Sequence, residues 1–231
     1  MAKQAPQTQV QRSEASRRAI LDAAIKIIAS DGYRRVTFDR IGQETGMSRG
    51  LVGYHFRSKV RLMEAVVTDI RERMAADLAA AGLGSTDGLQ SIITQLDMYM
   101  DRLQHRPTRA YVMLTLATES VAEERELQRA IRDQLASVRA NFRQWIVEGH
   151  ADGSVRRDVD PDGYAALLHA IQRGVAVQAL VDPDAFDVAP ARAAAMDFVR
   201  HAIAARPDAV QDAPAGRGTK QVAAGKTAAS R

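Results

Sequence analysis

The chain has 231 residues and no cysteine, which excludes disulfides, thiolate catalysis and cysteine-based zinc sites. Apolar residues make up 46% of it, enough for one large or two smaller domains, and this content excludes a mostly disordered protein. The net charge of +4 conceals an uneven distribution, because residues 1–64 hold 12 Lys and Arg against 6 Asp and Glu, whereas residues 65–205 hold 15 against 20. A basic front on an acidic body is typical of a protein whose first module lies on phosphate.

The first expected helix runs from about Ser13 to Ser30. Ile20, Ala24 and Ile27 recur at helical spacing, and Asp31-Gly32 ends the pattern. The wide apolar face of this helix predicts that it buries the elements that follow.

Residues 36–62 predict two short helices joined by a tight turn, and the second of them is a candidate recognition helix. Thr37 is a suitable N-cap for the first helix, Gly46 can end it in a left-handed conformation, and Ser48 can cap the second. We expect four apolar residues to fix the angle between the helices, namely Ile41, Met47, Leu51 and Val52. The polar remainder offers donors for base edges and charge for phosphates. An ordinary helical hairpin with solvated charges remains the alternative.

The rest of the chain predicts further helices and almost no strand alternation. A long connector begins at Lys59, Gly82 to Gly88 form a loop, and a helix carrying Leu89 to Leu103 stops before Pro107. Four more helices are expected over about 108–121, 124–149, 162–181 and 190–205. The fold class is therefore all-α with about nine helices. Residues 206–231 are rich in Ala, Gly, Pro, Lys and Arg, and we expect a disordered basic tail.

The last two expected helices, about 162–181 and 190–205, predict a homodimer. The first is apolar over more than one stripe, and its small residues Gly174 and Ala176 allow close approach. Two copies of this pair can form a four-helix bundle, although complete burial inside one subunit is the alternative. Such a dimer would place two recognition helices about 34 to 36 Å apart, as a palindromic operator requires.

The N-terminal part resembles the tetracycline-repressor (TetR) family of transcriptional regulators. The residues that carry the resemblance are the Arg17–Ala24 opening, Asp31-Gly32-Tyr33, Val36-Thr37, Ile41, Gly46-Met47-Ser48, His55-Phe56, Ser58-Lys59 and Leu62. Segments 149–153, 158–161 and 178–183 are similar to the subgroup that contains the choline-responsive repressor of betaine synthesis. The resemblance implies a ligand-responsive, sequence-specific repressor that a small molecule releases from a double-stranded DNA operator.

By this resemblance, Thr37 and Lys59 bind phosphates from helix N-termini, while Ser48, Arg49, Tyr54 and His55 enter the groove. Gly53 departs from the family pattern, which commonly has Tyr there, so Tyr54 and His55 are expected to carry more of the contact. One of these two rings must face inward at helical spacing. The implied division is an arm over 1–12, a three-helix DNA-binding domain over 13–62, a ligand-binding and dimerisation domain over 63–205, and the tail over 206–231.

Polar and aromatic residues inside apolar helices are candidates for the lining of an effector pocket. They are Tyr99, Tyr111, Thr115, Glu119, Trp145, His169 and Arg173. Each is more often an ordinary core or surface residue. Trp145 could offer its ring face to a cationic ligand.

Other functions are less consistent with the sequence. A constitutive architectural DNA-binding protein is the main alternative, and it would need no cavity. An enzyme is not expected, because His150 with Asp152 or Glu119 forms no convergent catalytic set. No cofactor or metal is expected either: residues 158–163 match the start of a calcium loop, but the twelfth position is His169 rather than Glu. No apolar run approaches the length of a membrane span, so we expect a cytoplasmic, nucleoid-associated protein.

Overall fold

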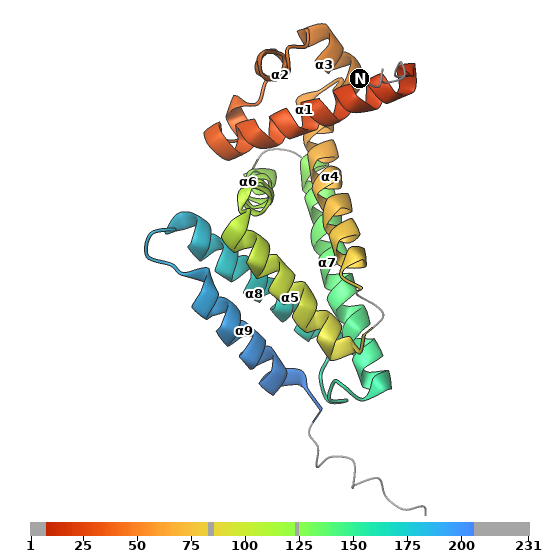
Figure 1. Ribbon diagram of the computed structural model, residues 1–231, viewed down its shortest axis with the longest axis vertical. Coiled ribbons are helices and arrows are strands. Elements are labelled where there is room, and N and C mark those ends of the chain that lie inside the picture. Colours follow the sequence, from red (N-terminus) through yellow and green to blue (C-terminus); the bar gives the residue numbers. More distant parts are fainter. Residues whose placement is uncertain (1–7, 83–85, 123–124, 206–231) are drawn as a thin grey trace, which may run out of the picture.

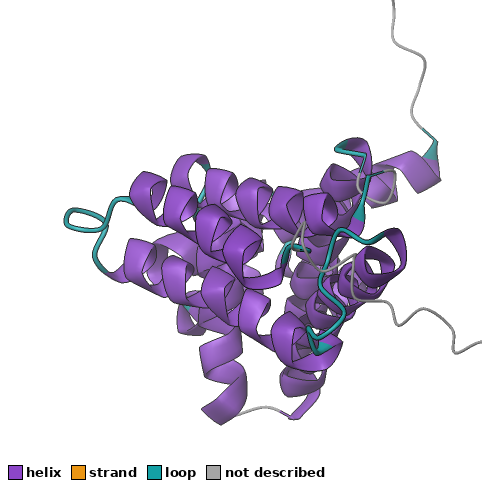
Figure 2. Cartoon of the chain, turned by 90° about the horizontal axis from the view of Figure 1, so that it is seen from below, coloured by secondary structure: helices purple, strands orange, loops and turns teal. Residues whose placement is uncertain are grey.

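The computed structural model describes residues 8–82, 86–122 and 125–205, and in these ranges the chain is helical apart from its short connections (Figures 1 and 2). The expected tail over 206–231 and most of the expected arm lie outside the described residues. Helix α1 spans Gln9–Asp31, so residues 9–12 are helical and the arm predicted over 1–12 is too long. The earlier start has a local cause, because Thr8 and Gln11 form a reciprocal capping box at 3.2 and 2.9 Å.

The predicted pair of short helices is present. After a 3₁₀ turn, η1 (Tyr33–Arg35), come α2 (Phe38–Thr45) and α3 (Arg49–Phe56). Ile41 and Val52 are fully buried, and Met47 packs against the same core. Leu51 is 38% exposed, which corrects the expectation that it locks the two helices, because it lies on the outer side of α3. Figure 1 shows these elements together at one end of the molecule.

Six further helices build the remainder. They are α4 (Lys59–Ala80), α5 (Gly88–His105), α6 (Thr108–Ala122), α7 (Arg125–Asp152), α8 (Pro161–Val181) and α9 (Val188–Ile203). Figure 1 shows α4 running away from the first three helices alongside α7, with α5, α8 and α9 below. Pro161 follows the N-cap Asp160, whose side chain accepts a hydrogen bond from the Gly163 nitrogen, so α8 begins where the sequence indicated.

Two hydrophobic cores hold the molecule together. The upper core joins α1–α4 to the start of α7 and to Val112, Met113 and Leu116 of α6. The lower core joins α5, α7, α8 and α9, with Phe142 and Ile146 at its centre. Side chains of α6 and α7 therefore pack in the same core as Val52 and Phe56 of α3.

Close backbone packing sets the geometry of the lower half. A Cβ at Gly88, where α5 begins, would overlap the Trp145 carbonyl oxygen and the Gly149 nitrogen of α7. The same end of α5 is held by Asp152, which accepts a hydrogen bond from the Gly88 nitrogen at 2.8 Å. An isolated antiparallel bridge between Val155 and Ala204 then ties the end of α9 to the α7–α8 connection. No helix among the described residues is long and apolar enough to cross a bilayer.

Candidate nucleic-acid interface and ligand pocket

The α2–turn–α3 unit is fixed by caps that the sequence predicts. The Thr37 hydroxyl accepts a hydrogen bond from the Arg40 nitrogen and the Ser48 hydroxyl from the Leu51 nitrogen, each at 3.2 Å. Gly46 ends α2 with a positive φ of 71°, which glycine adopts at little cost. Gly42 is required for a different reason, since a Cβ there would lie 2.6 Å from the Met47 carbonyl oxygen.

The outward face of α3 carries few side chains, and two of them stand out. Tyr54 is 78% exposed, and Arg49 is exposed at the first turn of the helix. Gly50 and Gly53 lie beside these side chains at helical spacing, and a Cβ at Gly50 would make an ordinary 3.9 Å contact with the Ser48 hydroxyl oxygen. A Cβ at Gly53 would make an ordinary 3.8 Å contact with the Phe38 ring. The face therefore offers one guanidinium, one phenol, the partly exposed Leu51 side chain and glycine backbone to a partner.

The other predicted contact residues are placed differently. His55 is half-buried with its ring 5.7 Å from that of Tyr54 and 6.3 Å from that of Phe56, so Tyr54 is the outward ring of the pair. Phe56 is buried, as expected. Lys59 begins α4, and its ammonium nitrogen lies 3.9 Å from the centre of the Tyr33 ring. This contact holds the lysine charge at the helix N-terminus, where anions bind favourably.

Arg49 forms an exposed ion pair that a DNA group can replace. Its guanidinium lies 3.3 Å from the Asp39 carboxylate, and both side chains are mostly exposed. Exposed ion pairs of this kind contribute at most about 1 kcal/mol, so a guanine edge or a phosphate can replace Asp39 at little cost. Arg57 extends the positive charge of this end, and its positive φ of 56° places it in a tight turn closed by the Ser58 nitrogen and the Phe56 oxygen.

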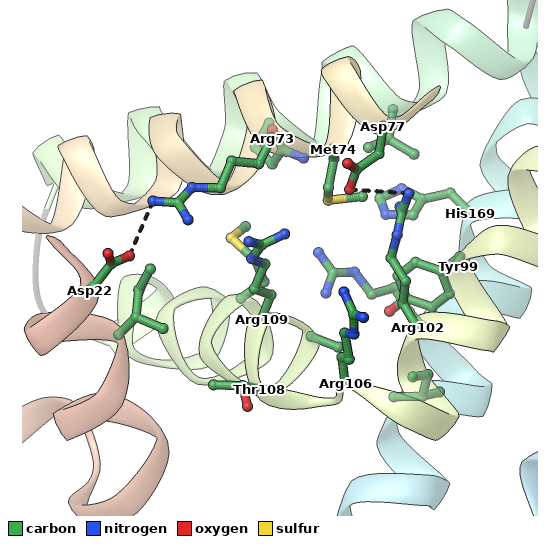
Figure 3. Close-up of a pocket in the computed structure, with 17 residues that line it drawn as sticks. Asp22, Arg73, Met74, Asp77, Tyr99, Arg102, Arg106, Thr108, Arg109 and His169 are labelled. Carbon is green, nitrogen blue, oxygen red and sulfur yellow. Dashed lines mark hydrogen bonds and ion pairs between the residues drawn. The ribbon is translucent and has the colours of Figure 1, made fainter. Parts of the chain in front are cut away.

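A pocket of about 310 Å³ lies where α1 meets the larger half of the molecule (Figure 3). The lining comes from α1, α4, α5, α6, α7 and α8 and from the connection between α5 and α6. Its apolar part consists of Ile25, Met74, Leu103, Ala110, Met113 and Val138. The pocket is of the size and mixed character of small-molecule sites.

Three of the seven predicted pocket residues line this cavity: Tyr99, His169 and Arg173. Burial lowers the pKa of His169 to about 4, with further lowering by the nearby charges of Arg173 and Arg139, so its imidazole is neutral near pH 7. Burial raises the pKa of Tyr99, whose hydroxyl has no hydrogen-bond partner among the described residues.

The structure does not bring the other four predicted residues to this cavity. Trp145 lies in the lower core, with its ring 5.8 Å from and perpendicular to that of Phe142. Tyr111, Thr115 and Glu119 are half-buried on α6 but are absent from the lining. The orientation of α6 about its axis is the reason, because after Arg109 it turns Ala110 and Met113 toward the pocket, and Tyr111, Thr115 and Glu119 lie on other sides of the helix.

Sequence reasoning missed the charged part of the lining, which is its main polar feature. Seven charged residues contribute, namely Asp22, Arg73, Asp77, Arg102, Arg106, Arg109 and Arg173, and only the last was a candidate. One signal was available: residues 102–118 contain three arginines and no acidic residue, although the surrounding domain is acidic. In Figure 3, Arg106 of the α5–α6 connection and Arg109 of the first turn of α6 point toward α4.

The outer surface of α8 and α9 carries exposed apolar side chains. Leu167 is 45% exposed, Val177 41% and Val181 76%, and Phe198 on α9 is 54% exposed. A Cβ at Gly174 would meet no atom, so the middle of α8 leaves room for another helix. Ala176, by contrast, is fully buried within the subunit, which corrects the expectation that it lies in the contact face.

Comparison with known proteins adds independent information. A model of the tetR family of bacterial regulatory proteins matches residues 20–66, and a model of the BetI-type transcriptional repressor C-terminal domain matches residues 86–204. An HTH-type transcriptional repressor of Mycobacterium tuberculosis is 27% identical over 176 residues, covering 70% of this chain and 93% of that protein. The BetI regulator of Cronobacter sakazakii is 23% identical, covering 81% and 91%.

Solved structures give the same architecture. A transcriptional regulator from Saccharomonospora viridis, in complex with choline, superposes with a TM-score of 0.75 at 24% identity. The alignment covers 84% of this chain and 100% of that chain. At this identity the similarity supports the fold.

Proposed function

Because the chain is a DNA-binding transcriptional regulator of the tetR family, with a C-terminal half of the BetI type, we propose that it is a repressor released from a palindromic operator by a small-molecule effector. The observation that carries the proposal is the outward face of α3, where Arg49 and Tyr54 stand exposed beside two glycines. Thr37 and Lys59 at the starts of α2 and α4 would bind the flanking phosphates, and Ser48 and His55 would complete the contact.

Footprinting on the DNA upstream of the protein's own gene tests this proposal, with unrelated DNA as competitor at near-physiological salt. We expect a protected palindrome, and we expect Arg49→Ala to weaken operator binding about 10- to 100-fold through loss of a bidentate base contact. Arg132→Ala removes an exposed arginine of α7 and is the matched control. Diffuse binding that competitor DNA abolishes would favour an architectural protein instead.

The proposal includes a homodimer through α8 and α9, over about 162–181 and 190–205. It is supported by the exposed apolar residues Leu167, Val177 and Phe198 and by the open space at Gly174. We propose residues 13–62 as the DNA-binding domain and 63–205 as the ligand-binding and dimerisation domain. A regulator of this kind works at the chromosome, so we place it in the cytoplasm, associated with the nucleoid.

Light scattering after gel filtration tests the dimer. Phe198→Glu would put a charge into the shared apolar surface and shift the protein to monomers. Val121→Glu is the matched control, because Val121 is 80% exposed on α6, away from α8 and α9. A Phe198→Glu protein that remains a dimer at micromolar concentration would show that another surface forms the contact.

The effector would act from the pocket at the junction of the two domains. Asp22 and Ile25 belong to α1, and the other lining residues belong to α4–α8 and the α5–α6 connection, so a bound molecule contacts both domains at once. Tyr99, His169 and Arg173 would contribute from α5 and α8, while Tyr111, Thr115, Glu119 and Trp145 would act only through packing. An effector that prefers one relative position of the domains would change the spacing of the two α3 helices, with a coupling of about 1 to 3 kcal/mol.

A further inference from the structure

The charge balance of the pocket points to the chemistry of its ligand, an inference that rests on the proposed function of this pocket. Five lining side chains are guanidinium groups and two are carboxylates. Arg73 lies 3.1 Å from Asp22 and 2.8 Å from Asp69, and Arg102 lies 3.2 Å from Asp77. These pairs neutralise both lining carboxylates.

Three guanidinium groups of the lining have no ion pair within the part of the chain that the structure describes. They are Arg106, Arg109 and Arg173, and they come from the α5–α6 connection, α6 and α8. Arg109 and Arg173 are half-buried, and burial strengthens the field of a charge that no counter-charge neutralises. Two regions far apart in sequence, residues 106–109 and α8, thus direct like charges into one apolar-walled space, where mutual repulsion destabilises the empty site.

The neutral polar groups of the pocket also bear on the chemistry of the ligand. Among the described residues the buried Tyr99 hydroxyl has no hydrogen-bond partner, and it can donate to a ligand. The side-chain oxygen of Gln134, a residue only 5% exposed, is an acceptor that also lacks a partner in this part of the chain. His169 stays neutral beside Arg173, so it adds a neutral imidazole rather than another charge. Donors therefore outnumber acceptors, and the complementary ligand is rich in acceptors.

A quaternary ammonium ligand would need the opposite surroundings. Such cations bind to clustered aromatic faces and to free carboxylates. Tyr99 and His169 are the ring-bearing residues of the described lining, Trp145 is in the lower core, and both lining carboxylates are engaged by arginines. The choline of the Saccharomonospora viridis structure is thus no guide to the ligand here.

We propose that the effector is an organic anion, with a carboxylate or phosphate group bound by Arg106, Arg109 and Arg173 and an apolar body packed against Met74, Met113 and Val138. Guanidinium groups bind both kinds of anion through paired, charge-assisted hydrogen bonds. The same anion competes with Asp22 for Arg73, whose ion pair joins α1 to α4. Weakening this ion pair reduces the attachment of α1, which belongs to the DNA-binding domain, to α4. The negative charge of the ligand is in this way connected to release from the operator.

Titration calorimetry on the full chain tests the proposal with two probes that share a phenyl ring but differ in charge, phenyl phosphate and benzyltrimethylammonium, at constant ionic strength. We expect phenyl phosphate to bind and benzyltrimethylammonium to bind at least tenfold more weakly. The double variant Arg109→Gln, Arg173→Gln should lose at least tenfold in phenyl phosphate affinity, Arg109→Lys, Arg173→Lys should retain part of it, and Arg132→Gln should match the wild type.

Equal binding of both probes, tighter binding of the cation, no binding of the anion, or unchanged anion affinity in the glutamine variant would overturn the proposal. Circular dichroism of each variant establishes that it is folded. Asp22→Asn removes the competing carboxylate and should raise phenyl phosphate affinity several-fold; an unchanged affinity would remove Arg73 from the mechanism. Operator binding without any probe is measured in parallel, because its absence contradicts the proposed repressor, whereas intact operator binding without anion selectivity contradicts only this inference.

Discussion

Gly50 leaves the backbone of α3 accessible on the exposed face of the helix. It lies on the exposed face of α3 between Arg49 and Tyr54, and among the described residues a Cβ there would contact the Ser48 hydroxyl oxygen alone, at 3.9 Å. Glycine inside a helix costs up to about 1 kcal/mol relative to alanine, so the bare position has a price in stability. A surface that must admit a sugar-phosphate chain or a thymine methyl group closely gives a physical reason for it.

The first prediction follows from this position. Gly50→Ala should raise the melting temperature by about 2–4 °C, which corresponds to about 1 kcal/mol at this length, and should also weaken operator binding. Asn141→Ala, at an exposed position inside α7, is the control that raises helix propensity without altering the α3 surface. Thermal unfolding and a gel-shift titration measure the two effects, and operator affinity equal to the wild type would show that the backbone of α3 stays clear of the DNA.

His169 gives a prediction about pH. Its pKa in the folded protein, about 4, lies below the ordinary value of 6.5, so between these values the unfolded chain binds a proton that the folded chain does not. The contribution of the neutral His169 to the free energy of unfolding is therefore fully present above about pH 6.5 and is lost as the pH is lowered toward 4. The drop in melting temperature between pH 7 and pH 5 should be smaller in His169→Gln than in the wild type, by about 4–8 °C, which corresponds to about 2 kcal/mol. Parallel pH profiles would contradict a buried, neutral imidazole.

Residue-level prediction from the sequence succeeded where local chemistry decides the outcome. The capping roles of Thr37, Gly46 and Ser48 depend on neighbouring residues only, and all three are present. Whether an arginine points into the pocket depends on how four helices are rotated about their axes. Local sequence patterns do not determine that rotation. Arg106 and Arg109 could therefore not be distinguished from solvated surface charges.

At the scale of elements, the crossing of α5 and α7 depends on two glycines. Gly88 and Gly149 let the backbones approach so closely that a side chain at Gly88 would overlap α7. Asp152 and Ser154 then accept hydrogen bonds from the Gly88 and Leu89 nitrogens at 2.8 and 3.1 Å. The C-terminal end of α7 thus caps the N-terminus of α5, a role that residues 64 positions apart in sequence cannot reveal in advance.

Gly88→Ala should destabilise the protein by about 1–3 kcal/mol, because the backbone of α7 must move to admit a methyl group. Denaturation in urea measures the change. Gly50→Ala is the matched control, since the same substitution makes only an ordinary 3.9 Å contact there, with the Ser48 hydroxyl oxygen. Equal unfolding midpoints for the two variants would mean that the helices can separate at this crossing without cost.

Helix positions were predicted more accurately than helix partners. The ends of α2, α5 and α8 agree with the expected capping residues and prolines, whereas α7 continues to Asp152 and α9 begins at Val188 and ends at Ile203. The C-terminal differences occur where the chain is held by tertiary bonds, such as the Arg156 nitrogen to the Ile203 oxygen at 2.9 Å, whereas α9 begins early because the Asp187 side chain accepts a hydrogen bond from the Ala189 nitrogen. Local signals alone do not report such bonds.

For the whole molecule, the main feature is that the upper core crosses the boundary between the proposed domains. Val112, Met113 and Leu116 of α6 and Leu127 and Ile131 of α7 complete the core formed by α1–α4. A fragment of residues 1–82, which keeps α1–α4 whole, would expose the apolar surface that these five residues cover, and burial is worth about 25 cal/mol per Å².

We therefore expect residues 1–82, expressed alone, to melt at least about 10 °C below the full chain, since each kcal/mol shifts the melting of a domain this small by about 4–8 °C. Circular dichroism at 222 nm follows the transition. The control is a fragment of residues 1–122, which restores α6 and should recover part of the difference. A short fragment as stable as the full chain would mean that α6 is a passive neighbour and that the two domains move independently.

The position of Trp145 has a spectroscopic consequence. It is the only tryptophan of the chain, and it is buried beside Phe142 in the lower core. Its emission therefore reports on the α5–α7–α8–α9 assembly alone, whereas far-ultraviolet dichroism averages over every helix. When the protein is heated, a difference between the two signals would separate the loss of the lower core from that of the upper one, without any introduced label.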